Sequence, residues 1–490
     1  MKKTNRIYII GAGFAGASIA AEIRRKGILG EVVAFLDDDR EKIGTRIDEI
    51  PVLGPINDVI DLLHRTPADE ALIAMPGIAR ERLKQIYLLL RRAGFTRVRI
   101  VPGVAQLVDG EAHLIQTREI DPEDLLGRNP VRINLRESLA YLRDRRVVIT
   151  GAGGSIGSEL ARQLLSGGAE RLYLFDHCEN SLYEIDRELK LLQEEGVGER
   201  ATIVPVVGEL QDADYTRFIL GRLRADVVFH AAAHKHVPMM EANPVEAIKN
   251  NVFGTEHLVR AAKTAGVPRF VMISTDKVVE PKSVYGASKR IAEQIVLSRN
   301  GDGHAYMVVR FGNVLGSSGS IIPLFRKQIL RGGPVTLTDP ETTRYFMTIS
   351  EAASLVLQAG GVGRAGELYI LDMGEPVRIR DLAEQMIRFY GFEPEQDIKV
   401  EVVGLRPGEK RHESLYESSE RPEPTEHPRL NRVTDPGHFV PDLADLISEL
   451  RPICFLDPER PDDYRNRRRL RGLLTTHVRS LEMPEYEPEY

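Results

Sequence analysis

The sequence is short of several features that would point to particular classes of protein. Its 490 residues contain only two cysteines, Cys178 and Cys454, which cannot form a disulfide framework and have the wrong spacing for a zinc site. The net charge of −6 is small for this length and gives no electrostatic argument for a nucleic-acid partner. No stretch reaches the roughly 18 apolar residues of a membrane-spanning helix, so no transmembrane segment is expected.

The N-terminus also lacks a targeting signal. Residues 1–5 lead directly into a strand-like run, which is not the pattern of a signal peptide. Together with the low cysteine content, this predicts a reducing, cytoplasmic location, with the inner face of the membrane as an alternative.

What the chain does contain is a pattern of strand, glycine-rich turn and helix that occurs twice. An apolar run over residues 6–10 precedes the turn GAGFAG, and a second run over 147–150 precedes GAGGSIG. Further strands are expected at residues 31–36, 71–74, 98–101, 171–175, 227–230 and 270–273. Strands that alternate with helices predict an α/β fold of two tandem Rossmann-like, doubly wound parallel sheets.

Both glycine-rich turns have the spacing of a nucleotide-binding loop. Glycine permits positive φ and a close approach to a pyrophosphate, and the following helix N-terminus offers free N–H groups to the phosphates. An acidic residue at the end of the next strand can accept hydrogen bonds from a ribose, and Asp37 and Asp176 stand at these positions. Asp176 favours NAD over NADP, because a carboxylate repels a 2′-phosphate, although NADP remains an alternative.

The first turn is the weaker of the two signals. Its candidate nucleotide site consists of Gly11, Gly13, Gly16 and Asp37. A domain that packs well around these glycines and binds nothing catalytic explains them equally well.

Reactive side chains follow the strand over residues 270–273. Ser274, Thr275, Asp276 and Lys277 come at its carboxyl end, the edge where open α/β sheets bind ligands. Tyr285 and Lys289 stand four residues apart and share one face of a predicted helix, so the ammonium should lower the pKa of the phenol. The alternative is that Asp276 caps a turn and Lys277 is solvated.

These strings resemble a known enzyme family. From Arg146 to about Glu413 the chain is similar to extended short-chain dehydrogenase/reductases, and more narrowly to the polysaccharide-biosynthesis UDP-N-acetylglucosamine 4,6-dehydratases. The resemblance rests on GAGGSIGSEL, HAAAHKHVPMMEANPVEAIKNNVFGT, STDKVVEPKSVYGASK, RFGNVLGSSGSIIPLF, TRYFMTISEA and GLRPGEK. Residues 1 to about 125 resemble the extra nucleotide-binding domain of the larger members, which often carry methionine where this chain has Tyr285.

The resemblance implies a reaction and a set of roles. Tyr285, assisted by Lys289 and Thr275, would take the 4-hydroxyl proton of a UDP-N-acetylhexosamine as hydride passes to NAD. Lys277 would then remove the C5 proton and Asp276 would protonate the departing C6 hydroxyl, giving the 4-keto-6-deoxy sugar nucleotide. Two alternatives stay open: a UDP-sugar 4-epimerase, which has no need of Asp276 and Lys277, and a non-catalytic dinucleotide-sensing protein.

The same resemblance implies binding residues, an architecture and an assembly. Asn251 would brace the active-site strands, and the protein would form a homo-oligomer. Independently of the resemblance, no metal is expected, because no carboxylate or cysteine completes a ligand set with His234 and His236. The expected cofactor-binding residues are Gly151, Gly154, Ser155, Ile156, Gly157, Asp176, Glu209, Leu210, Ala231 and Lys289, and the expected substrate-binding residues are Lys235, Asn313, Arg344, Arg406 and Glu409.

The chain divides into four predicted parts. These are an N-terminal Rossmann-like nucleotide-binding domain (1–125), a linker (126–145), a catalytic domain with a smaller substrate-binding lobe (146–416) and a C-terminal extension (417–490). In the extension, residues 417–428 predict a loop. A basic cluster over residues 465–471 and an acidic end formed by Glu485, Glu487 and Glu489 predict a solvated helix or an oligomer contact, with an anionic membrane surface as the minority alternative.

Overall fold

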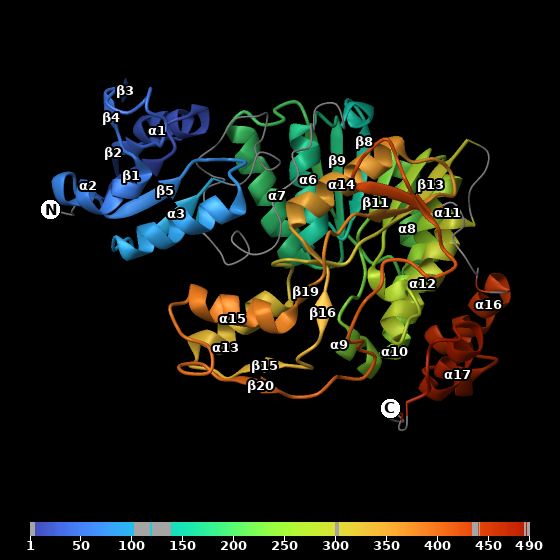
Figure 1. Ribbon diagram of the computed structural model, residues 1–490. Helices are drawn as coiled ribbons and strands as arrows, with labels where there is room; N and C mark the ends of the chain where they lie inside the picture. The colour runs from blue at the N-terminus through green and yellow to red at the C-terminus, as the bar shows by residue number, and fades with distance from the viewer. Residues whose placement is uncertain are drawn as a thin grey trace. The chain divides into compact units, whose positions relative to one another are not determined.

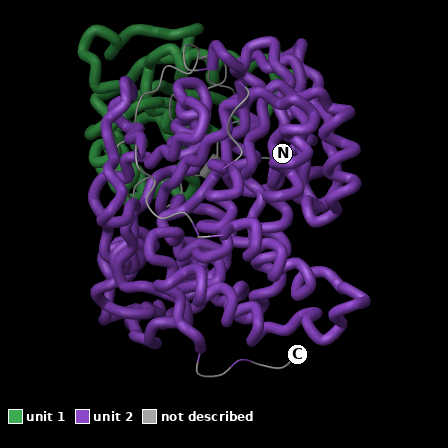
Figure 2. The backbone as a smooth tube through the Cα atoms, turned by 90° about the vertical axis from the view of Figure 1, so that its right-hand side faces the viewer, with its two compact units in different colours: residues 1–135, 192–197 green, residues 136–191, 198–490 purple. Residues whose placement is uncertain are grey.

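The computed structural model of the chain describes residues 5–101, 118–119, 139–298, 303–433, 440, 442–484 and 487. The chain forms two compact units, one of residues 1–135 and 192–197 and the other of residues 136–191 and 198–490 (Figure 2). Most of the predicted linker, residues 126–138, lies outside the described residues, as do Glu485 and Glu489. None of the helices in the described part of the chain is both long enough and apolar enough to cross a membrane.

Unit 1 contains a seven-stranded sheet in the order β3-β4-β2-β1-β5-β6-β7. Neighbouring strands from β4 to β6 are parallel, as predicted, because each connection crosses over through a helix or turn. The strands are β1 (Arg6–Ile10), β2 (Glu31–Leu36), β3 (Arg46–Ile47), β4 (Ile50–Leu53), β5 (Glu70–Ile73), β6 (Arg97–Ile100) and β7 (Arg118–Glu119), and the helices are α1 (Phe14–Lys26), η1 (Ile56–Asp58), α2 (Val59–Arg65) and α3 (Arg80–Arg92). The core residues Ile7, Ile9, Phe35 and Leu72 are fully buried, which accounts for the nearly continuous apolar runs of these strands.

Unit 2 contains a nine-stranded sheet in the order β10-β9-β8-β11-β12-β13-β18-β22-β21. Figure 1 labels four of its strands, β8, β9, β11 and β13. The strands from β10 to β18 are parallel, and β22 joins antiparallel to β18. The strands are β8 (Arg146–Thr150), β9 (Arg171–Asp176), β10 (Thr202–Val207), β11 (Val227–His230), β12 (Arg269–Ile273), β13 (Ala305–Arg310), β18 (Leu368–Leu371), β21 (Pro422–Pro424) and β22 (Leu430–Val433). The predicted α/β class with two doubly wound sheets is confirmed.

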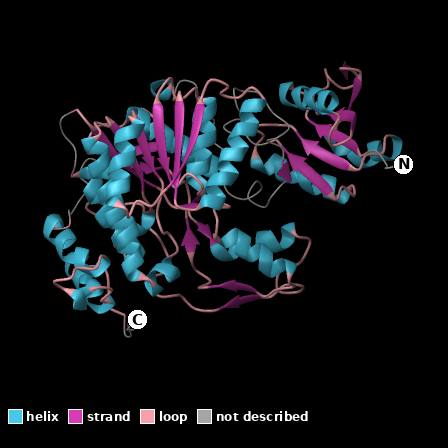
Figure 3. Ribbon diagram, turned by 180° about the vertical axis from the view of Figure 1, so that it is seen from behind, coloured by secondary structure: helices cyan, strands magenta, loops and turns pink. Residues whose placement is uncertain are grey.

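Helices lie on both sides of this sheet (Figure 3). Helices α6 and α14 pack together, and α8, α11 and α12 pack together. The helices are η4 (Ala140–Leu142), α6 (Ser155–Ser166), α7 (Glu179–Glu194), α8 (Ala213–Leu223), α9 (Val237–Ala242), α10 (Pro244–Ile248), the π-helix η5 (Lys249–Phe253), α11 (Gly254–Thr264), η6 (Asp276–Val278), α12 (Val284–Leu297) and α14 (Ile349–Val362). Helix α12 is buried over almost its whole length, which makes it the central helix of its layer.

A smaller lobe is built from segments that follow β13. Helices α13 (Ile321–Leu330) and α15 (Ile379–Phe389) pack with the strand pair β15 (Val335–Leu337) and β20 (Val400–Val402). Two further strand pairs are β14 (Asn313–Val314) with β17 (Phe346–Met347) and β16 (Thr343–Arg344) with β19 (Val377–Arg378).

The C-terminal residues are part of unit 2. The prediction of a loop over 417–428 is wrong at residues 422–424, because β21 pairs with β22 at the edge of the large sheet. The helices that follow are α16 (Leu443–Cys454), η7 (Pro461–Asp463) and α17 (Arg467–His477). Leu446, Leu450, Leu470 and Leu474 are fully buried in the same hydrophobic core as helix α12.

Candidate active site

The glycine-rich turn after β8 is closely packed against the strand ends beside it. Gly151 has φ +67°, and a Cβ there would lie 2.7 Å from the Ala232 backbone nitrogen. A Cβ on Gly157 would lie 2.1 Å from the Gly151 carbonyl oxygen, so helix α6 can approach the turn only at a glycine. Asp176 accepts hydrogen bonds from Gly153 N at 2.9 Å and from Cys178 N at 2.9 Å, which holds its carboxylate next to the turn.

A cavity of about 210 Å³ opens at the carboxyl ends of β8, β9, β10 and β11. Its lining includes four of the predicted cofactor residues, Gly151, Asp176, Glu209 and Leu210. The structure therefore brings residues from four separate strand ends together at one edge of the sheet, as the parallel topology requires.

The remaining predicted cofactor residues lie along the same turn and edge. Gly154 is the N-cap of α6, and Ser155 and Ile156 begin that helix. The Ser155 hydroxyl accepts a hydrogen bond from Ser318 N at 3.1 Å, which joins the turn to the segment between β14 and α13. Ala231 follows β11 and donates its N–H to Thr150 O at 3.1 Å.

Thr275, Asp276 and Lys277 form a hydrogen-bonded group at the end of β12. Lys277 Nζ donates to Asp276 Oδ1 at 2.8 Å, and the Thr275 hydroxyl donates to the same oxygen at 3.0 Å. Asp276 is completely buried, and within the described part of the chain its Oδ2 has no hydrogen-bond partner. The alternative of a solvated Lys277 is wrong, because this lysine is bound to a buried carboxylate.

The charge around Lys277 favours its protonated form. Burial lowers the pKa of Lys277, but the carboxylates of Asp276 and Glu413 more than compensate, so its pKa lies above the ordinary value. Asn313 Oδ1 accepts a second hydrogen bond from Lys277 Nζ, at 3.0 Å. Asn313 was expected among the substrate-binding residues, and the structure places its side chain on the lysine.

Tyr285 and Lys289 stand on the first turns of α12, both buried. Burial raises the pKa of Tyr285 to about 12, against the lowering effects of the Lys277 charge and a hydrogen bond with Thr275. The expectation that the Lys289 ammonium lowers the Tyr285 pKa is wrong among the groups of the protein itself. The cation that lowers it is Lys277, and burial outweighs this effect. Lys289 Nζ donates instead to the Ile273 carbonyl at 2.7 Å, and burial lowers the pKa of Lys289 to about 8.

Asn251 connects the helix of Tyr285 to the loop that carries Lys235. Its amide donates to Ser288 Oγ and to His234 O, each at 3.0 Å, and its oxygen accepts from His234 N at 2.9 Å. Asn251 therefore bridges α12 and the loop after β11, and its bonds do not join two of the strands that it was expected to brace. The residue lies in the π-helix η5, an irregularity often found at functional sites.

The expected substrate residues fall into two groups. Arg344 donates to the carbonyls of Lys410 and Arg411, and Arg406 pairs with Glu409 at 2.9 Å, so these three side chains gather around the segment 406–411. Lys235, in the loop after β11, has a lowered pKa because of partial burial and the charge of Lys277.

The two histidines beside Lys235 point to different neighbours. The His234 ring lies edge-on to His177, with centroids 6.3 Å apart, whereas His236 packs against Gly319.

The turn of unit 1 repeats the geometry of the turn in unit 2. A Cβ on Gly16 would lie 2.1 Å from the Gly11 carbonyl oxygen, Gly11 has φ +107°, and Gly13 has open space around it. Asp37 accepts from Ala12 N at 2.7 Å and from Asp39 N at 2.9 Å. Unlike Asp176, Asp37 also has a lysine partner, Lys42, at 3.4 Å.

Sequence reasoning missed three groups of unit 2 that act on this site. Glu413 is buried and its charge affects both Lys277 and Tyr285. His230 is fully enclosed, and Glu241 reaches the start of α12. Each of the three residues lies in one of the family strings or next to one. Their closeness to the site depends on how distant segments pack, so the sequence alone could not predict it.

Comparison with known proteins finds two families and several similar proteins. Residues 147–435 match the family described as polysaccharide biosynthesis protein, and residues 1–102 match the family described as CoA-binding domain. The chain is 41% identical over 445 residues to the capsular polysaccharide biosynthesis protein CapD of Staphylococcus aureus, a match that covers 90% of this chain and 73% of CapD.

One further relative and one solved structure cover mainly unit 2. The UDP-glucose 4-epimerase of Rickettsia bellii (strain OSU 85-389) is 31% identical over 290 residues, which is 56% of this chain and 79% of that protein. The X-ray structure of Pen from Bacillus thuringiensis superposes with a TM-score of 0.54 at 32% identity and covers 60% of this chain and 90% of Pen.

Proposed function

This chain belongs to the polysaccharide biosynthesis protein family, and from that premise we propose that it removes water from a UDP-N-acetylhexosamine, most simply UDP-N-acetylglucosamine. The product would be the 4-keto-6-deoxy sugar nucleotide. The observation that carries this proposal is the buried ion pair of Asp276 and Lys277 at 2.8 Å, next to Thr275 and Tyr285.

The turn after β8 and the adjoining cavity fit a nicotinamide dinucleotide. A Cβ at Gly151 would collide with the Ala232 backbone, so a glycine keeps the turn against this edge, and Asp176 lines the cavity where a ribose would present its hydroxyls. The carboxylate favours NAD over NADP. When bound, this cofactor would supply reversible hydride transfer at the sugar.

The first chemical step needs a group that accepts the 4-hydroxyl proton. Tyr285 supports this role because the Thr275 hydrogen bond and the Lys277 charge both favour its anion. Lys289, whose pKa burial lowers to about 8, lies one helical turn after Tyr285 and can exchange a proton near neutral pH.

The elimination step needs a base and an acid at adjacent carbons. In the resting protein Lys277 holds the proton and Asp276 is its carboxylate partner. Movement of that proton along the 2.8 Å hydrogen bond gives an amine, which can accept the C5 proton, and a carboxylic acid, which can protonate the departing C6 hydroxyl. After water leaves, Lys277 is again an ammonium and Asp276 a carboxylate, so the pair ends as it began. The hydride taken from C4 would then return to C6, and a proton added at C5 would balance the one that Tyr285 took from the 4-hydroxyl, so the 4-keto-6-deoxy sugar would form with no net redox change.

The UDP portion would be held by the segment 406–411 and its neighbour Arg344. A guanidinium forms paired, charge-assisted hydrogen bonds with a diphosphate, and Glu409 can accept from ribose hydroxyls. Arg406 is suited to move onto a ligand, since its side chain is 55% exposed. Lys235 would contact the hexose.

A UDP-sugar 4-epimerase is the second candidate, and the similarity to a protein of that name favours it. It would use Thr275, Tyr285 and Lys289 but has no need of Asp276 and Lys277. A non-catalytic dinucleotide-sensing protein is the third, and the first unit, with Gly11, Gly13, Gly16 and Asp37, offers a second nucleotide site in any of these cases.

One incubation separates the three. The full chain is mixed with NAD and UDP-N-acetylglucosamine, and the sugar nucleotide is analysed by mass spectrometry. We expect a product lighter by one water, absent when the variant Tyr285→Phe replaces the wild type. An epimer of unchanged mass would establish the epimerase, and bound cofactor with no turnover would establish the sensor.

A further inference from the structure

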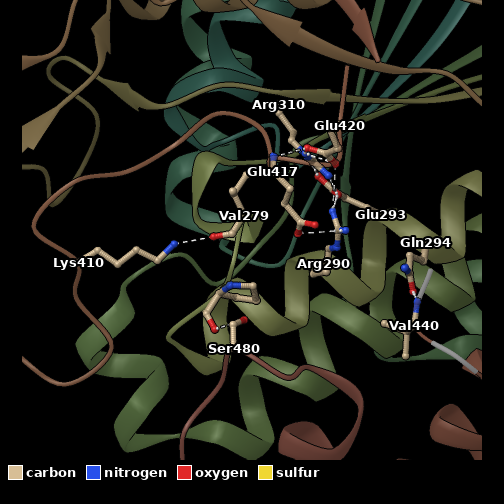
Figure 4. A network of polar contacts seen from close by, with 11 residues as sticks. Val279, Arg290, Glu293, Gln294, Arg310, Lys410, Glu417, Glu420, Val440 and Ser480 are labelled. Carbon is tan, nitrogen blue, oxygen red and sulfur yellow. Dashed lines mark hydrogen bonds and ion pairs between the residues drawn. The ribbon is translucent and has the colours of Figure 1, made fainter. Parts of the chain in front are cut away.

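The C-terminal residues of unit 2 contact the active-site helix α12 and the loop before it at several points (Figure 4). Val440 N donates to Gln294 Oε1 at 2.7 Å, and the Ser480 hydroxyl donates to Pro281 O at 3.0 Å. Lys282 pairs with Glu482 at 2.7 Å. Helix α12 and the residues just before Tyr285 are therefore held by parts of the chain far beyond the catalytic strings.

A buried charge cluster forms one of these attachments. Arg310 at the end of β13 binds Glu293 of α12 at 2.7 Å and Glu420 at 2.8 Å, and Arg290 of α12 binds Glu420 at 3.4 Å and Glu417 at 3.2 Å (Figure 4). These groups fix the middle of α12 to the segment that leads into β21.

A second attachment reaches the first residue of α12. Glu241 of α9 accepts the Val284 N–H at 2.6 Å through Oε1, and Arg471 of α17 donates to its Oε2 at 2.9 Å and to its carbonyl at 3.0 Å. Arg467 and Arg471 also both pair with Glu487. The basic cluster predicted as a solvated helix or an oligomer contact is thus engaged within the chain at these arginines, whose side chains are only 7% and 4% exposed.

We propose that Glu241 and Arg471 are positioning residues of the active site, through which helix α17 fixes the first turn of α12 and hence the Tyr285 side chain. The proposal rests on the nicotinamide-dependent oxidation in the proposed function and is independent of whether dehydration or epimerisation follows.

Helix geometry gives the physical reason. The first N–H groups of a helix have no partner within it, and a carboxylate placed there is stabilised by both the hydrogen bond and the helix dipole. Ser283 already caps α12 by accepting from Gly286 N at 3.0 Å, so Glu241 and Ser283 together fix the turn that contains Tyr285. Without Arg471, the Glu241 carboxylate keeps the helix contact but loses the cation that sets its position.

The test compares Arg471→Ala with the matched control Arg469→Ala. Arg469 lies on the same helix and pairs with Asp463, with no contact to Glu241 among the bonds of the described residues. The first readout is the single-turnover rate of nicotinamide reduction by the sugar nucleotide, and the second is hydrogen–deuterium exchange of the backbone over residues 283–289.

For Arg471→Ala we expect a rate lowered by roughly 10- to 100-fold, since misplacement of a reacting group by about 1 Å costs this much, with KM for the sugar nucleotide changed far less. Exchange at Val284 should accelerate. Arg469→Ala should match the wild type in both readouts. Glu241→Gln keeps an oxygen for the Val284 N–H but weakens the Arg471 contact. Its rate and its exchange should therefore lie between those of Arg471→Ala and Arg469→Ala. If Arg471→Ala does not fold, Glu241→Gln tests the same link.

The proposal would be overturned if Arg471→Ala showed the same rate and the same exchange as the control Arg469→Ala. The same outcome for Glu241→Gln would also overturn it. A wild type that reduces no nicotinamide with any UDP-hexosamine would instead reject the proposed function, and the exchange comparison would then decide the positioning link alone.

Discussion

At the scale of single residues, Asp276 carries the distinction between the candidate reactions. One of its carboxylate oxygens is held by Lys277 and Thr275, and the other faces the α-carbon of Gly312, where a Cβ would lie 3.1 Å away. A glycine at position 312 therefore leaves space beside the free oxygen. In the proposed dehydration, Lys277 would protonate this carboxylate, which would pass the proton to the departing C6 hydroxyl.

The substitution Asp276→Asn tests this role with little change in size. An amide cannot hold the transferable proton, so we expect formation of the dehydrated sugar to fall about 10²- to 10⁴-fold. Reduction of the nicotinamide should persist, because Thr275, Tyr285 and Lys289 are intact. Mass spectrometry measures the dehydrated sugar, and absorbance measures the reduced nicotinamide.

Asp214→Asn is the control, since this residue lies on α8 with its side chain 86% exposed. Unchanged product formation in Asp276→Asn would contradict the dehydratase mechanism and favour an epimerase.

The sequence allowed the reactive residues to be predicted but not their pairings. Thr275, Asp276 and Lys277 follow a strand, and their place at the sheet edge follows from the parallel topology. That Lys277 reaches Asn313, and that its charge acts on Tyr285 where Lys289 was expected to, depends on how β13 and α12 pack. Side-chain direction across separate elements is not encoded in local spacing.

At the scale of elements, His230 joins two strands and a helix. His230 is the last residue of β11. Its Nδ1 lies 2.7 Å from Thr150 Oγ1 at the end of β8, and its Nε2 lies 2.9 Å from Thr255 Oγ1 on α11. Burial, together with the Lys289 charge, lowers the pKa of His230 to about 3. The imidazole is therefore neutral in the folded protein over the whole physiological range.

This predicts an acid-sensitive contribution to stability. The unfolded state binds a proton at His230 below its ordinary pKa of 6.5, whereas the folded state does not until about 3. The free energy of unfolding should thus be highest above pH 6.5 and fall as the pH drops, by up to about 1.4 kcal/mol per unit from this group.

Urea unfolding at several pH values checks this, and His230→Asn should show a correspondingly smaller slope between about pH 5 and 6.5. His64→Asn, at an exposed position of α2, should keep the wild-type slope. An unchanged slope in His230→Asn would show that the ring is not kept neutral by burial.

The cluster around Arg310 links β13, α12 and the C-terminal segment. Replacement by methionine, Arg310→Met, leaves Glu293 and Glu420 buried with one cation fewer, and we expect a loss of about 3–5 kcal/mol in the free energy of unfolding. The exposed pair Arg217–Asp214 provides the comparison, and Arg217→Ala should cost only about 0–1 kcal/mol.

Urea unfolding followed by circular dichroism measures both variants. If Arg310→Met is as stable as Arg217→Ala, the cluster contributes no more than a surface ion pair.

The sequence was most informative where elements are regular. Strands β1, β2 and β11 have the predicted bounds, since apolar runs between polar turns define buried parallel strands. The C-terminal part was the least predictable. The proline-rich strand β21 exists only through pairing with β22, and Arg467 and Arg471 of α17 are buried beside partners such as Glu241 and Glu487.

At the scale of the whole molecule, both units contain a glycine-rich turn beside an aspartate, but the segments near the turn differ between the units. Asp37 and Asp176 each accept one backbone N–H from the turn, Ala12 or Gly153, and one from the second residue after the aspartate. Unit 2 adds the proposed catalytic group after β12 and the smaller lobe, whereas unit 1 adds Lys42 next to its aspartate. The two units therefore share the placement of an aspartate beside a glycine-rich turn, and they differ in what surrounds it.

Two matched substitutions test whether catalysis depends on one unit or on both. Gly16→Ala and Gly157→Ala each place a methyl group 2.1 Å from the carbonyl oxygen of the first glycine in the turn, so each must open its own turn to a similar degree. We expect Gly157→Ala to lower NAD affinity and turnover by at least about tenfold, because the turn of unit 2 packs against the catalytic edge. Gly16→Ala should leave both the NAD affinity of unit 2 and the turnover unchanged. Titration calorimetry measures the affinity, and product formation measures the turnover. Equal losses in the two variants would mean that unit 1 takes part in the reaction, and its nucleotide site would then have to be regarded as coupled to the active site.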